Sequence, residues 1–133
     1  MGTVDYSLAI ETDRDFDDVV AATRAALADE GFGVLTEIDV KATMKAKLDV
    51  DRDEYLILGA CNPPLAHEAL QAEPELGVLL PCNVVVYRTG GKTRVSAVAA
   101  EQMLGMVGNE ALMPVATEVG RRLSRVLEAV AAG

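Results

Sequence analysis

The stretch ILGACNPPLAHEALQAEPELGVLLPCNVVVY, residues 57–87, decides the fold because it holds two strand-like apolar runs with a helix between them. Each run carries a cysteine that is followed by an asparagine. Residues 55–60 are continuously apolar, which is typical of a central strand. Residues 78–88 predict the next strand, and Pro81 inside this run requires a strand start, an edge or a bulge nearby.

The segment between the two runs predicts a helix with a clear beginning. Asn62 is a favourable N-cap, and Pro63 suits the first helical position, where a missing N–H costs no hydrogen bond. The helix is expected to end near Gln71. It carries His67, the one histidine of the chain, which is expected at the surface or at an interface.

The rest of the chain predicts an alternation of strands and helices with short connections. The irregular segments are expected at 72–77 and 100–109. Strands are predicted at 7–12, 32–39 and 93–99, and helices at 16–30, 40–48 and 110–131. With 133 residues and no linker, the chain forms one domain spanning residues 1–133. The pattern predicts an α+β fold, a two-layer α/β sandwich whose mostly antiparallel sheet of about five strands has helices chiefly on one face.

Composition restricts the function classes. Aromatic residues make up 4% of the chain and Trp is absent, so the core is expected to be aliphatic and stacking platforms for single-stranded nucleic acid are disfavoured. The formal net charge of −9 disfavours binding to nucleic acid and to anionic membranes. The start of the chain has no leader-like pattern, and no apolar run reaches the ~18 residues of a membrane span. A cytoplasmic protein with reduced cysteines is expected.

The known short motifs for phosphate loops, zinc proteases and serine hydrolases are absent from the sequence. The cysteines are the remaining candidates. Cys61 directly precedes a predicted helix N-terminus, where the helix dipole and unpaired N–H groups favour a thiolate or a bound anion. Cys82 lies at the start of a strand or inside it. Both could equally be small buried hydrophobic residues of the core.

Cys61 and Cys82 also have the chemistry to ligate zinc or copper. His67 does not complete such a site within one chain, because it lies about 8 Å along the helix axis from the N-terminus and about 120° around the helix from Cys61. A metal site is therefore expected to use the two cysteines alone or to include a second chain.

The chain carries GF at residues 31–32, a paired Cys-Asn motif, LLPCNVVVY and MLGMVGN. On these motifs it closely resembles the DUF302 family, small bacterial and archaeal proteins without an assigned function. The resemblance implies a two-layer α/β sandwich, a homodimer and no established activity. Relatives often carry Asp-Pro where this chain has Ala99 and Ala100, so a role that requires a carboxylate there is in doubt. The positions that match the family motif are Cys61, Asn62, Pro63, Ala66, Leu80, Pro81, Cys82 and Asn83.

Three hypotheses for the function follow. The leading one is a non-catalytic homodimeric domain that binds a small ligand, anionic or metal-containing, near Cys61, Asn62, Cys82 and Asn83. The second is a thiol enzyme or redox protein with Cys61 as the reactive thiol and Cys82 as the resolving thiol. The third is a structural or partner-binding module with both cysteines in the core. The sequence identifies no cofactor.

Overall fold

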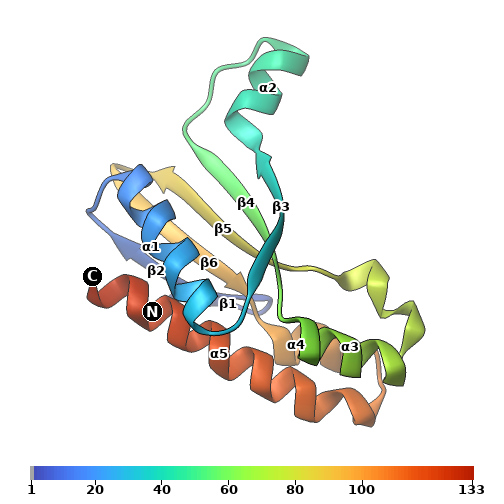
Figure 1. Ribbon diagram of the computed structural model, residues 1–133. Helices are drawn as coiled ribbons and strands as arrows, with labels where there is room; N and C mark the ends of the chain where they lie inside the picture. Colours follow the sequence, from blue (N-terminus) through green and yellow to red (C-terminus); the bar gives the residue numbers. More distant parts are fainter. Residues whose placement is uncertain (1) are drawn as a thin grey trace.

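The computed structural model describes residues 2–133, with side chains from Asp5 onward. The strands of this part of the chain are β1 (Gly2–Val4), β2 (Ser7–Thr12), β3 (Gly33–Asp39), β4 (Tyr55–Cys61), β5 (Cys82–Thr89) and β6 (Lys92–Val98). They form one sheet in the order β1-β2-β6-β5-β4-β3, and all neighbouring strands are antiparallel. β4 and β5 therefore lie side by side within the sheet, whereas β3 forms one of its edges (Figure 1).

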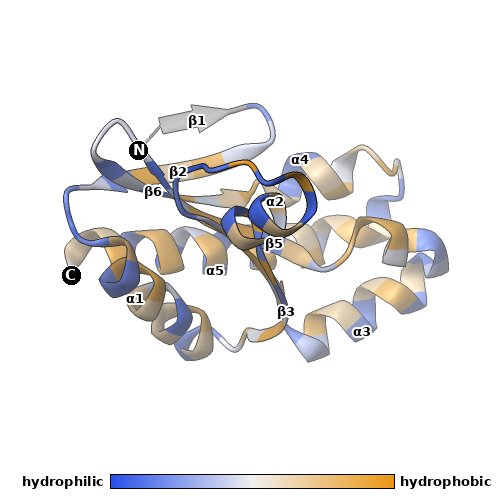
Figure 2. Cartoon of the chain, turned by 90° about the horizontal axis from the view of Figure 1, so that it is seen from above, coloured by the Kyte–Doolittle hydropathy of each residue, from blue (hydrophilic) through white to orange (hydrophobic). Residues whose placement is uncertain are grey.

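The helices cover one face of this sheet and one of its ends. The described α-helices are α1 (Phe16–Asp29), α2 (Val40–Leu48), α3 (Pro63–Ala72), α4 (Ala100–Gly105) and α5 (Met113–Ala132). Two 3₁₀ helices, η1 (Pro74–Leu79) and η2 (Glu110–Leu112), follow α3 and precede α5. Figure 2 shows α1 and α5 on the same side of the sheet, where they contact each other.

The structure confirms the predicted α+β architecture and corrects several local expectations. β5 begins at Cys82, so Pro81 stands directly before a strand start, one of the arrangements expected for it. Residues 78–81 are not part of a strand: Val78 and Leu79 end η1, and Leu80 and Pro81 connect it to β5. The predicted irregular segment 100–109 contains α4, and the sheet has a sixth strand, β1, that the sequence pattern did not predict.

The core is aliphatic, as the composition predicts. Alternate residues of the central strands, Leu58, Val84 and Val95, point toward the helices and are fully buried. The apolar stripe of α5 packs against them, because its spacing keeps one face of the helix on the sheet. Phe32 is the one aromatic side chain in the core of the described residues.

The opposite face of the sheet carries no helix and is only partly buried. Tyr55 and Tyr87, which are partners in the pairing of β4 with β5, stack there with ring centroids 4.9 Å apart. Asn83 and Arg94 share this face. It will be called the open face.

α2 stands away from the rest of the molecule beyond the ends of β3 and β4 (Figure 1). Asp39 caps it by accepting a hydrogen bond from the Ala42 N–H at 2.9 Å. None of its residues is buried, and apolar side chains on α2, β3 and the following loop are exposed. We call these residues the β3–α2 surface: Leu35, Ile38, Leu48 and Val50. None of the helices in residues 2–133 has the length and apolar character needed to cross a bilayer.

Candidate functional site

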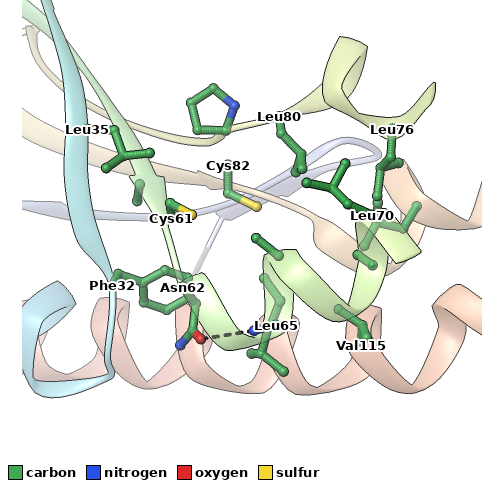
Figure 3. Close-up of a pocket in the computed structure, with 16 residues that line it drawn as sticks. Phe32, Leu35, Cys61, Asn62, Leu65, Leu70, Leu76, Leu80, Cys82 and Val115 are labelled. Atoms are coloured by element: carbon green, nitrogen blue, oxygen red, sulfur yellow. Dashed lines mark hydrogen bonds between the residues drawn. The ribbon is translucent and has the colours of Figure 1, made fainter. Parts of the chain in front are cut away.

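A cavity of about 230 Å³ lies where the ends of β4 and β5 meet α3 and α5 (Figure 3). Its walls are almost entirely apolar, because the helices turn their buried faces toward it. The exposed side chains of Leu35 and Leu70 lie at its rim. The remaining lining residues are Phe32, Ala60, Cys61, Asn62, Leu65, Ala66, Ala69, Leu76, Leu80, Pro81, Cys82, Leu104, Val115 and Val119.

The two cysteines come together at this cavity. Cys82 pairs with Ala60 across the β4–β5 ladder, so Cys61 is one residue further along the neighbouring strand. Both are free thiols, Cys82 buried and Cys61 half-buried. Figure 3 shows both sulfur atoms directed into the cavity.

Burial, together with the nearby Cys61, raises the pKa of the Cys82 thiol to about 11. At pH 7 only about one molecule in 10,000 then carries the thiolate. A resolving cysteine attacks as a thiolate, so this environment weighs against Cys82 in that role.

The two asparagines of the paired Cys-Asn motif occupy different environments. Asn62 is 6% exposed and belongs to the junction between β4 and α3. Asn83 is exposed and lies on the open face, because successive side chains of a strand point to opposite faces and Cys82 takes the inner one. The structure therefore brings Cys61, Asn62 and Cys82 to the cavity and does not bring Asn83 there.

The N-terminus of α3 has no free N–H groups to offer an anion. Pro63 and Pro64 lack an N–H. The next two N–H groups, of Leu65 and Ala66, donate to the Asn62 side-chain oxygen at 3.4 Å and to its carbonyl oxygen at 2.8 Å. Anion binding at a helix N-terminus requires unpaired N–H groups. The geometry therefore speaks against the anionic ligand that the sequence suggested.

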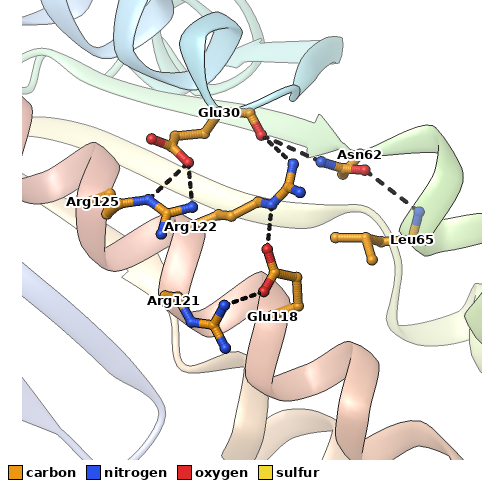
Figure 4. A network of polar contacts seen from close by, with 7 residues as sticks. All are labelled: Glu30, Asn62, Leu65, Glu118, Arg121, Arg122 and Arg125. Atoms are coloured by element: carbon orange, nitrogen blue, oxygen red, sulfur yellow. Dashed lines mark hydrogen bonds and ion pairs between the residues drawn. The ribbon is translucent and has the colours of Figure 1, made fainter.

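Asn62 also belongs to a polar network that joins three helices (Figure 4). Its amide nitrogen donates to the Glu30 carbonyl oxygen at 3.3 Å, and Arg122 of α5 donates to the same oxygen at 3.0 Å. Arg122 also donates to Glu118 at 2.7 Å, and this hydrogen bond lowers the pKa of the Glu118 carboxyl. Arg125 donates twice to the Glu30 carboxylate, at 3.0 and 2.8 Å. The network fixes the end of α1 and the start of α3 against α5.

Two glycines occupy positions where a side chain would be strained, Gly31 by its backbone conformation and Gly59 by its neighbours. Gly31, which follows Glu30, has φ +84°, and a Cβ there would lie 3.1 Å from the Asn62 amide nitrogen. A Cβ on Gly59 would collide with Thr36 of β3 and with Pro81, the residue directly before β5. The glycine of the GF motif thus serves the same junction as Asn62, and Gly59 lets β3 and β5 close around β4.

Within residues 2–133 no three His, Cys, Asp or Glu side chains are placed to hold one metal ion. His67 is exposed and takes no part in the cavity. Two sulfurs therefore make up the donor set at this site.

Sequence reasoning missed most of the apolar lining and the partners of Asn62. Val115 and Val119 belong to the apolar stripe of α5, but the sequence does not show which part of that stripe faces a cavity.

Comparisons with known proteins identify the family of this chain. The model of the family described as "Domain of unknown function DUF302" matches residues 8–130. The chain is similar to the crystal structure of an uncharacterized conserved protein DUF302 from Bacillus stearothermophilus, with 27% sequence identity and a TM-score of 0.86. That likeness covers 92% of this chain and 96% of the other. The comparison with curated proteins gave no match. The chain belongs to the DUF302 family.

Proposed function

We propose that this chain is a non-catalytic domain that binds a small apolar molecule in the cavity beside Cys61 and Cys82, and that it works as a homodimer. The observation that carries the ligand proposal is the apolar cavity of about 230 Å³ at which the family motif converges. Ligand sites are concave and mostly apolar, with a few polar groups that fix orientation. Here the two thiols are those groups.

Size and polarity define the ligand class. An apolar cavity of ~150 Å³ in another protein stays dry and binds benzene, so the present cavity accommodates at least one ring or a short branched chain. A charged ligand would lose its hydration against leucine, alanine and proline side chains without compensating partners. A neutral apolar ligand therefore fits better than an anion.

A titration with benzene, followed by NMR of the backbone amides, tests the ligand proposal. Saturable shifts are expected at Cys61 and Ala66. The variant Ala66→Phe fills the cavity from α3 and is expected to abolish them. Ala25→Phe, an exposed change in α1, is the matched control and is expected to bind as the unchanged protein does. Shifts that are absent from the unchanged protein, or that persist in folded Ala66→Phe, refute the proposal.

The β3–α2 surface supports the homodimer. α2 packs mainly against β3 and β4 of its own hairpin, and Leu48 is 66% exposed. A nine-residue helix without a buried face gains little from helix propensity alone. β3 is in addition an open sheet edge with an apolar row beside it, which favours strand pairing with another chain. Antiparallel pairing of β3 with β3 of a second copy about a two-fold axis would bond the free sheet edge and cover the β3–α2 surface of both copies.

Sedimentation velocity tests the homodimer. The unchanged protein is expected to sediment as a dimer, and Leu48→Glu is expected to shift it toward monomer by burying a charge at the interface. Val78→Glu, a change at a 77% exposed residue of η1, is the matched control and should leave the dimer intact. A monomeric unchanged protein, or a dimer indifferent to Leu48→Glu, refutes this part of the proposal.

A further inference from the structure

The two thiols share features that a pair of core cysteines does not need. They lie on adjacent strands one residue out of register, and both sulfurs point into the cavity (Figure 3). Cys61 is close enough to contribute to the raised pKa of Cys82. Cys61 is half-buried and Cys82 is buried, so Cys61 is the more accessible of the two thiols.

The donor set excludes the common metal ions. Structural zinc takes four ligands, and calcium and magnesium take oxygen. The described residues offer two sulfurs here and no third ligand. Two thiolates bind best to a soft atom that needs only two ligands from the protein.

The apolar walls of the cavity favour a bound complex without net charge. A bis-thiolate complex that kept a net charge would be costly beside these side chains. A trivalent arsenical with one organic group becomes neutral once it has bound two thiolates. Its organic group then fills the rest of the cavity.

We infer that Cys61 and Cys82 form a two-sulfur site for a soft thiophilic centre that carries one organic group, with a monosubstituted trivalent arsenical as the defining ligand class. The inference rests on the proposed function, because the organic group requires the apolar cavity. With phenylarsine oxide, two S–H bonds and the As=O bond break and two As–S bonds form. The oxygen leaves with both protons as water, and arsenic stays trivalent, so no oxidant or reductant is consumed.

Intact mass spectrometry of the reduced protein with phenylarsine oxide tests the inference. One adduct per chain is expected, with the loss of one water. A small dithiol should remove this adduct, whereas a monothiol at the same total concentration of thiol groups should not. Cys61→Ser and Cys82→Ser are each expected to weaken retention about 10²- to 10⁴-fold, because the second sulfur acts at high effective concentration.

An adduct that survives in either serine variant, or that a monothiol removes as readily as a dithiol, overturns the inference. The benzene titration separates this failure from failure of the proposed function. If benzene binds and the unchanged protein forms no dithiol-specific adduct, the two-sulfur site alone is refuted. If benzene does not bind and the adduct still forms, the thiols are paired but the organic group is not held by the cavity, which refutes both the inference and the proposed function.

Discussion

Replacing Asn62 by alanine is expected to destabilise the protein much more than the same change at Asn83, although both asparagines follow a cysteine in the same motif. Asn62 caps α3 through the Leu65 N–H and donates to the Glu30 carbonyl oxygen. Asn83 is exposed on the open face. The two variants form a matched pair, since each removes the same amide.

The magnitude follows from the two hydrogen bonds. Loss of an asparagine N-cap costs about 1 kcal/mol. Loss of the bond to Glu30 adds about 0.5–1.5 kcal/mol, at the lower end because Arg122 still donates to that carbonyl oxygen. Asn62→Ala should therefore lower the free energy of unfolding by about 1.5 kcal/mol. Asn83→Ala should change it by less than about 0.5 kcal/mol.

Urea denaturation followed by circular dichroism measures both values. Protein concentration must be the same throughout, because the stability of a dimer depends on it. Equal losses for the two variants, or a loss below about 0.5 kcal/mol for Asn62→Ala, would refute the assignment of Asn62 to the β4–α3 junction.

Three further outcomes are expected. Gly59→Ala should destabilise by more than about 2 kcal/mol in thermal or urea unfolding, since its Cβ would overlap Thr36 and Pro81; a loss near zero would show that the strands have room. Ala99, the N-cap of α4, provides no side-chain cap, so Ala99→Ser should raise the free energy of unfolding by about 0.5–1 kcal/mol, and a decrease would contradict this. Burial raises the pKa of Cys82 from 9.0 to about 11. The unfolded thiol therefore ionises first. From pH 9 to pH 11 the free energy of unfolding should fall by about 2 kcal/mol more than it does in Cys82→Ala, and identical slopes would contradict the raised pKa.

The helices with strong local signals were predictable from the sequence. Asp39 and Asn62 are N-caps, Pro63 starts α3, and each of these signals depends only on neighbouring residues. α4 was missed, because its six residues lack a capping side chain at Ala99 and contain glycine at the end. Its helical conformation depends on packing against α5, which local sequence does not report.

The candidate site was only partly predictable. The alternation of strand side chains could have separated Cys82 from Asn83, since neighbouring residues of a strand face opposite sides. The second proline, Pro64, likewise signalled that the α3 N-terminus has few N–H donors for an anion. The cavity itself was not predictable, because it depends on how α3 and α5 meet the ends of β4 and β5.

Native mass spectrometry of the protein, purified without chelator or excess reductant, tests the central claim most directly. The account predicts a dimer that carries the extra mass of a small molecule, and loss of that mass in the folded Ala66→Phe variant. A bare dimer would contradict ligand binding in the cavity, and a bare monomer would contradict both the ligand and the homodimer.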